Sequence, residues 1–236
     1  MAILNVTPDS FYAASRIGDT GELVRRAQKA LEDGATILDL GGCSTRPHST
    51  PATEEEEWQR VEPALAALRK ELPNVQLSLD TFRPEIARRA LEQFGPMIIN
   101  DISGGNDDMF AVVRKYRVPY IWTFCGDYDH LEERMSRIAD IELILDPGFG
   151  FLGGVDNDYD CLRRMDCLRR YGREVLVGVS RKSMIWKLLG ITPEESLAGT
   201  QVLHLRALQC GATILRVHDV RAAAQTIELY NKMNYN

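Results

Sequence analysis

The chain has 236 residues, of which 44% are hydrophobic and 26% are charged, and its formal net charge at pH 7 is -6. This length suits one large or two small globular domains, and the acidic balance without a basic block argues against nucleic acid or an anionic membrane as a partner. The sequence has no apolar run of transmembrane length, and MAILNVTPDSF does not have the layout of a signal peptide. The five cysteines include no CxxC pair. These features predict a cytoplasmic protein.

Two kinds of segment alternate from one end of the chain to the other. Short apolar runs typical of buried parallel strands occupy residues 2–6, 35–40, 75–80, 97–101, 118–124, 141–146, 174–180 and 212–218. Amphipathic stretches separate them, most clearly at 20–34 and 54–72. Eight such units in a chain of this length predict a single (β/α)8 TIM barrel, one domain over residues 1–236. A doubly wound open sheet is the alternative.

Polar residues end nearly every predicted strand. They are Asn5, Asp39, Asp80, Asn100, Asp101, Asp146, residues 180–183, Arg216, His218 and Asp219. A single strand-end Asp or Asn is about as often a turn former or helix cap as a ligand contact. In a barrel, however, these ends converge on one mouth, where active sites are built. The pattern therefore predicts one shared small-molecule site.

Basic residues gather in three of the predicted loops. Arg181 and Lys182 follow the seventh strand, Arg216 and His218 follow the eighth, and Arg46 lies in loop two. Arg181 or Lys182 could be a solvated charge at the start of a helix, although the helix dipole disfavours cations there. Loops after strands seven and eight of barrels commonly bind phosphate. With acids and amides at the other strand ends, we expect a ligand with a phosphate end and a hydrogen-bond-donor end, such as an amino-pyrimidinone ring.

Seven short motifs occur in the order seen in the dihydropteroate synthase family. They are ILNVTPDSF, STRP, SLDT, INDISGG, DPGFGF, SRKS and RVHDV. The sequence thus resembles a family of pterin-binding transferases of folate biosynthesis. These enzymes join 4-aminobenzoate to a dihydropterin bearing a CH2–O–diphosphate, and release 7,8-dihydropteroate and diphosphate. The resemblance implies a Mg2+-dependent enzyme that forms a homodimer through its last helices.

The resemblance also implies a role for individual residues. Those on the pterin side are Asp80, Asn100, Asp146 and Lys182. The diphosphate side comprises Asn5, Arg46, Arg216 and His218, and Asn5 is in addition the metal ligand. The 4-aminobenzoate side comprises Thr45, Pro47, Phe151 and Ser183. Asp80, Lys182 and Arg216 are the residues implied to take part in catalysis.

Several positions depart from the family pattern. Ala13 and Cys43 stand where acids are common, Thr123-Phe124-Cys125 replaces Met-His-Met, and Leu152-Gly153 replaces Gly-Lys. The segment at 126–140 is short. These departures leave open a catalytically weak pterin-binding homologue. A methyltetrahydrofolate:corrinoid methyltransferase is a second alternative, disfavoured because it needs no cations for diphosphate.

The acidic run at residues 54–57 is a further feature with two interpretations. At the start of a helix it complements the helix dipole, so we expect it to be solvated rather than functional.

Overall fold

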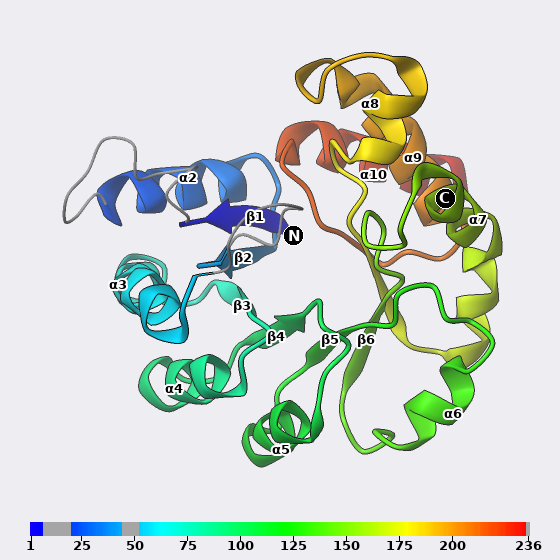
Figure 1. The fold of residues 1–236 in the computed structure, drawn as a ribbon. Helices are drawn as coiled ribbons and strands as arrows, with labels where there is room; N and C mark the ends of the chain where they lie inside the picture. The colour runs from blue at the N-terminus through cyan, green and yellow to red at the C-terminus, as the bar shows by residue number, and fades with distance from the viewer. Residues whose placement is uncertain (7–19, 44–51, 235–236) are drawn as a thin grey trace. The chain divides into compact units, whose positions relative to one another are not determined.

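The computed structural model describes residues 1–6, 20–43 and 52–234 (Figure 1). Each predicted strand is present, and the strand order is β1 to β8 in sequence order. The strands are β1 (Ala2–Asn5), β2 (Ile37–Gly41), β3 (Gln76–Asp80), β4 (Ile98–Asp101), β5 (Tyr120–Thr123), β6 (Leu143–Asp146), β7 (Glu174–Val177) and β8 (Ile214–Leu215).

Helices separate the strands, as the amphipathic stretches predict. They are α2 (Thr20–Glu32), α3 (Glu54–Glu71), α4 (Pro84–Phe94), α5 (Asp107–Tyr116), α6 (Leu131–Ser136), α7 (Val155–Arg164), α8 (Ser183–Leu189), α9 (Leu197–Gln209) and α10 (Val220–Asn234), with 3₁₀ helices η2 (Met165–Tyr171) and η3 (Glu194–Ser196). None of the helices in the described ranges is long and apolar enough to cross a membrane.

One compact unit comprises residues 2–120 and 140–142. Its strands β1 to β4 are parallel, and Figure 1 shows α2 to α5 along their outer side. The register pairs Asn5 with Gly41, Gly41 with Asp80, and Asp80 with Asn100. Four strand ends therefore finish at the same level, which brings their polar side chains to one edge of this unit.

The second compact unit comprises Met1, residues 121–139 and residues 143–236. Here β6 pairs with β7 and β7 with β8, all parallel. The ammonium group of Met1 donates to the carbonyl of Leu215 at 3.0 Å, and the Val217 amide donates to the Met1 carbonyl at 3.0 Å. The regular part of β8 has only two residues, fewer than the apolar run predicts.

The acidic run at the start of α3 differs from the expectation. Thr53 caps the helix, because its hydroxyl accepts from the Glu56 amide at 3.2 Å while the Glu56 carboxylate accepts from the Thr53 amide at 2.8 Å. Glu57, however, is fully buried and forms an ion pair with Arg83. The prediction that the whole run is solvated is therefore wrong for Glu57, because the helix turns this residue inward.

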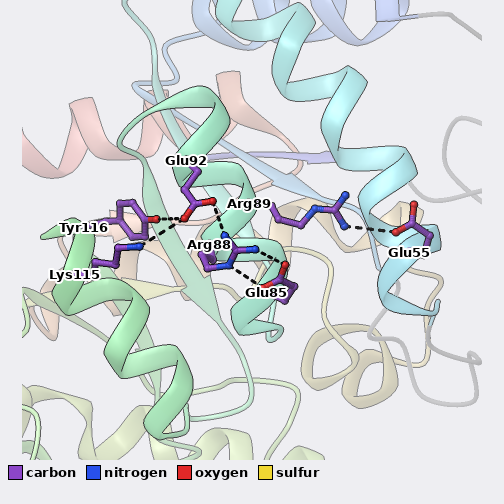
Figure 2. Close-up of polar contacts among 7 residues, drawn as sticks. All are labelled: Glu55, Glu85, Arg88, Arg89, Glu92, Lys115 and Tyr116. Carbon is purple, nitrogen blue, oxygen red and sulfur yellow. Dashed lines mark hydrogen bonds and ion pairs between the residues drawn. The ribbon is translucent and has the colours of Figure 1, made fainter.

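Exposed ion pairs link the outer helices of the same unit (Figure 2). Glu55 on α3 pairs with Arg89 on α4 at 3.5 Å. The Tyr116 hydroxyl on α5 donates to the Glu92 carboxylate on α4 at 2.6 Å. Pairs this exposed contribute little to stability individually.

Candidate active site

Asn5 and Asp80 share the space above Gly41. A Cβ atom placed on Gly41 would lie 3.0 Å from the amide oxygen of Asn5 and 3.7 Å from Oδ2 of Asp80. Glycine at the end of β2 thus leaves room for the side chains that flank it from β1 and β3. Both side chains are half-buried. This strand edge therefore presents an amide oxygen and a carboxylate side by side.

Asn100 is oriented by a buried acid, Asp39. Its amide nitrogen donates to the two carboxylate oxygens of Asp39, at 3.4 Å to Oδ1 and 3.2 Å to Oδ2. Its amide oxygen is buried and accepts no hydrogen bond from the described part of the chain. A buried acceptor without a partner is costly, and a ligand N–H would satisfy it. Asp39 is thus a positioning residue for Asn100.

Asp101 has a different role from its neighbour Asn100. Its carboxylate accepts from the Tyr120 hydroxyl at 2.8 Å and from the Ser103 amide at 2.7 Å. These bonds hold the end of β4 against β5 and the following turn. Asp101 is therefore a structural residue, although the sequence places it among the strand-end candidates.

Asp146, at the end of β6, is the buried carboxylate of the second unit. Its Oδ1 accepts from the Gly148 amide at 2.9 Å and its Oδ2 accepts from the Thr123 hydroxyl at 3.1 Å. Burial raises the pKa of this carboxyl, while Lys182 in particular, the two hydrogen bonds and Arg216 oppose that rise. The arrangement gives a buried acceptor group that interacts electrostatically with two cations.

Lys182 precedes α8 and reaches the loop after β6. Its ammonium group donates to the carbonyl of Phe149 and lies 4.9 Å from the ring centroid of Phe151. A side chain at Gly150 would meet Lys182 Cδ at 2.9 Å, so this glycine makes the approach possible. Phe151 is 42% exposed. The adjacent Ser183 opens α8 and is half-buried.

Asp158 supports the same loop from α7. Its buried carboxylate accepts from the Gly150 amide at 2.7 Å. Burial raises the pKa of this carboxyl, and the Gly150 amide and Lys182 oppose the rise. Sequence reasoning missed Asp158, because an isolated acid in a helix carries no local sign of burial.

Arg216 lies on the same side as Lys182. A Cβ atom on Gly178 would be 3.8 Å from Cβ of Arg216 and 3.9 Å from the ammonium nitrogen of Lys182. The backbone amide of His218 donates to the Ser180 hydroxyl at 3.2 Å, and the His218 side chain is exposed. The structure therefore brings Asp146, Lys182 and Arg216 together, with His218 two residues beyond.

Arg181 turns away from this cluster. Its guanidinium forms two bonds to Asp219, both at 2.8 Å, and donates to the carbonyls of Pro193 at 3.0 Å and Glu194 at 2.9 Å. Of the two adjacent cations, Lys182 faces the Asp146 cluster and Arg181 fastens the surrounding loops.

The part of the chain that the structure describes holds no group of three or more His, Cys, Asp or Glu suited to a metal ion. The Asn5 amide oxygen is a hard donor of the kind that Mg2+ accepts, and Mg2+ commonly takes its remaining ligands from water and phosphate. A magnesium ion bound with a phosphate ligand fits this donor. Thr45, Arg46, Pro47 and Ala13 lie outside the described residues.

Comparisons with known proteins agree with one another. The family described as "Pterin binding enzyme" matches residues 1–142 and 129–218. A dihydropteroate synthase of Synechocystis is 38% identical over 95% of this chain and 86% of its own length.

Two solved structures are also similar. A dihydropteroate synthase from Clostridium difficile, determined in the presence of pteroic acid, has 30% identity and a TM-score of 0.92, with 100% of this chain and 96% of the other covered. A Xanthomonas albilineans dihydropteroate synthase with 4-aminobenzoic acid has 33% identity and a TM-score of 0.90, with 100% and 92% covered. The predicted (β/α)8 barrel fold is thereby confirmed.

Proposed function

This chain belongs to the dihydropteroate synthase family of pterin-binding enzymes, and we propose that its strand-end residues perform that family's reaction. The chain is a transferase that condenses 4-aminobenzoate with (7,8-dihydropterin-6-yl)methyl diphosphate to give 7,8-dihydropteroate and diphosphate. The observation that carries the assignment of residues is the cluster of buried Asp146 with Lys182 and Arg216.

The pterin ring is bound by acceptors at its donor edge. Asp146 offers two carboxylate oxygens, each already held by one protein donor, and Asn100 offers the buried amide oxygen that has no other partner in the described ranges. Paired N–H donors of an amino-pyrimidinone ring satisfy such a carboxylate. Asp80 completes the acceptor set, and Lys182 donates to the ring carbonyl and N5.

The diphosphate is bound by cations. Arg216 and His218 follow β8, and we assign Arg46 of loop two to the same role by its family motif. Asn5 would hold Mg2+ through its amide oxygen, and the ion would supply positive charge to the diphosphate oxygens. Removal of Mg2+ with a chelator should abolish turnover and weaken diphosphate binding, while free pterin still binds.

The reaction breaks the bond between the pterin methylene carbon and the diphosphate oxygen, and forms a bond from that carbon to the arylamine nitrogen. Arg216 neutralises charge on the leaving diphosphate, while Lys182 acts on the pterin ring. Asp80 stabilises positive charge on the dihydropterin methylene. The arylamine then loses a proton to solvent or to the released diphosphate.

The arylamine is positioned by four residues. These are Thr45, Pro47, Phe151 and Ser183. Support for this assignment comes from the exposed ring of Phe151, which lies beside Lys182 and offers an apolar surface to an aromatic ring. A weakly basic arylamine needs orientation more than activation, so these residues act by placing the nitrogen.

A second function, that of a catalytically weak pterin-binding protein, is favoured by one observation. Thr123-Phe124-Cys125, at the end of β5 and just after it, depart from the family pattern next to Asp146. Formation of 7,8-dihydropteroate from both substrates separates the two functions, because a binding protein would retain pterin without making product. Absence of methyl transfer from methyltetrahydrofolate to a corrinoid would exclude the methyltransferase alternative.

We propose that the functional protein is a cytoplasmic homodimer, and that each chain forms one domain over residues 1–236. Large apolar side chains are exposed on α9 and α10, namely Val202 at 66%, Leu229 at 66% and Met233 at 64%, and a dimer interface would cover such side chains. Light scattering of wild type and of Leu229→Glu tests the dimer. A single cooperative unfolding transition tests the single domain.

A further inference from the structure

Thr123 is the last residue of β5 and is fully buried beside Asp146. Its hydroxyl donates to Oδ2 of Asp146 at 3.1 Å, while the Gly148 amide donates to Oδ1 at 2.9 Å. Each oxygen of the carboxylate thus has one fixed donor. The carboxylate plane cannot rotate without breaking one of these bonds, and each oxygen keeps a lone pair for a ligand.

Packing fixes the direction of the Thr123 hydroxyl. A Cβ atom on Gly148 would stand 2.8 Å from the methyl carbon of Thr123, so this methyl group lies against the Gly148 backbone. Because β-branched side chains have few allowed χ1 positions, a methyl group held there leaves the hydroxyl aimed at Asp146. Serine would keep the donor without this constraint, and valine would keep the shape without the donor.

The other groups that face Asp146 within this unit are charged or weakly polar. Lys182 comes from the start of α8, Arg216 follows β8, and the thiols of Cys125 and Cys161 approach from the loop after β5 and from α7. The two cations favour the ionised carboxylate, but a cation on a long side chain does not define a carboxylate plane. The two short neutral donors, Thr123 and Gly148, do define it.

From these contacts we infer that Thr123 is a positioning and specificity-determining residue, whose hydroxyl holds Asp146 as a paired acceptor for the amino-pyrimidinone edge of the substrate. The inference rests on the proposed function of Asp146. The inference assigns a function to Thr123, a position where this chain departs from the family pattern. A ring with an oxo group in place of the 2-amino group presents an acceptor to the same carboxylate and is rejected.

Two ligands and three variants test this role. Calorimetry would compare 6-hydroxymethylpterin with 6-hydroxymethyl-lumazine, its 2-oxo analogue, on wild type, Thr123→Val and Thr123→Ser. Thr123→Val should lose about 5- to 10-fold in pterin affinity, the range expected for one hydrogen bond, and the preference for pterin should fall by the same factor. Thr123→Ser should stay within about twofold of wild type. Thr226→Val on α10, which loses a hydroxyl bonded to Gln201, is the matched control and should keep the preference.

A second measurement needs no ligand. Burial raises the pKa of Asp146 and the Thr123 hydroxyl opposes this rise, so its loss in Thr123→Val should move the carboxyl titration of Asp146, followed by carbon NMR, to higher pH. Thr123→Ser should restore the wild-type titration. A purely structural role predicts no such movement.

The outcomes distinguish failure of the proposed function from failure of the role assigned to Thr123. Failure of wild type to bind 6-hydroxymethylpterin would overturn both the proposed function and this inference. Pterin binding by wild type, with an unchanged pterin preference in Thr123→Val, would overturn the inference alone. Equal losses for both ligands, without a shift in the Asp146 titration, would likewise reduce Thr123 to a packing residue.

Discussion

Arg181 and Asp219 form a two-pronged ion pair, with Nε to Oδ2 at 2.8 Å and Nη2 to Oδ1 at 2.8 Å. The pair joins the loop after β7 to the loop after β8, which carry Lys182 and Arg216. Arg181 has a φ of 53°, a left-handed conformation unusual for arginine. The pair therefore holds the backbone from which Lys182 extends.

Loss of this pair should destabilise the protein in a pH-dependent way. Arg181→Met should cost about 1–2 kcal/mol at pH 7, a modest value because both side chains are about a quarter exposed. Arg181 lowers the pKa of Asp219, so the pair's contribution is present above the ordinary value of 3.8 and is lost as pH falls through the lowered value. Urea unfolding should show a smaller difference from wild type at pH 3 than at pH 7. A difference that does not change with pH would contradict this.

The buried pair of Glu57 and Arg83 should contribute more. Arg83→Met leaves Glu57 buried without its cation, which should cost about 3–5 kcal/mol at pH 7 in urea unfolding. Burial raises the pKa of Glu57 above its ordinary value of 4.5. The protonated form is thus favoured in the folded state, so the loss should shrink as pH falls through the raised pKa, which lies above 4.5, and should change no further below 4.5.

The exposed pair on the same two helices provides a control. Arg89→Met breaks the contact with Glu55 that Figure 2 shows, between side chains that are 32% and 65% exposed. Arg89→Met also removes the cation–π contact of Arg89 with the Trp58 ring, at 4.2 Å to the ring centroid, so a small loss of stability is expected, well below that of Arg83→Met. Similar losses in the Arg89 and Arg83 variants would mean that burial does not distinguish the pairs.

Lys182 and Arg216 should differ in which substrate group they bind. Arg216→Ala should weaken the diphosphate-bearing pterin far more than free pterin, because its guanidinium serves the diphosphate. Lys182→Ala should weaken both, since its ammonium group lies beside Asp146 and the loop after β6. Calorimetry with the two ligands measures this difference. Equal losses for both ligands in both variants would remove the assignment.

Asp146→Asn should disrupt pterin binding while preserving the shape of the side chain. The amide nitrogen presents donors where the ring also presents donors, which leaves buried groups unpaired. The expected cost is about 1–3 kcal/mol of pterin binding free energy. Undiminished affinity in calorimetry would make Asp146 a strand-end structural residue.

Strand positions could be predicted from the sequence because buried parallel strands are continuous apolar runs. The position of Asn5, Asp80 and Asn100 at one level of the sheet follows from the same alternation of strands and helices. Alternation of side chains along a strand also offered a signal that Asn100 and Asp101 cannot face the same way.

Other features depend on contacts that sequence patterns do not carry. Arg181 and Lys182 are adjacent and chemically alike, and their separation depends on Asp219, far along the chain. Glu57 is one of four identical residues, and its burial depends on a partner 26 residues away. Thr123 breaks a family pattern, and its bond to Asp146 is visible only once β5 and β6 are paired.

The most direct measurement is diphosphate release by the purified chain, supplied with (7,8-dihydropterin-6-yl)methyl diphosphate and Mg2+, with and without 4-aminobenzoate. We expect sustained release only when 4-aminobenzoate is present, with one 7,8-dihydropteroate formed for each diphosphate. Pterin binding without 7,8-dihydropteroate formation, or release at the same rate without the arylamine, would contradict the account.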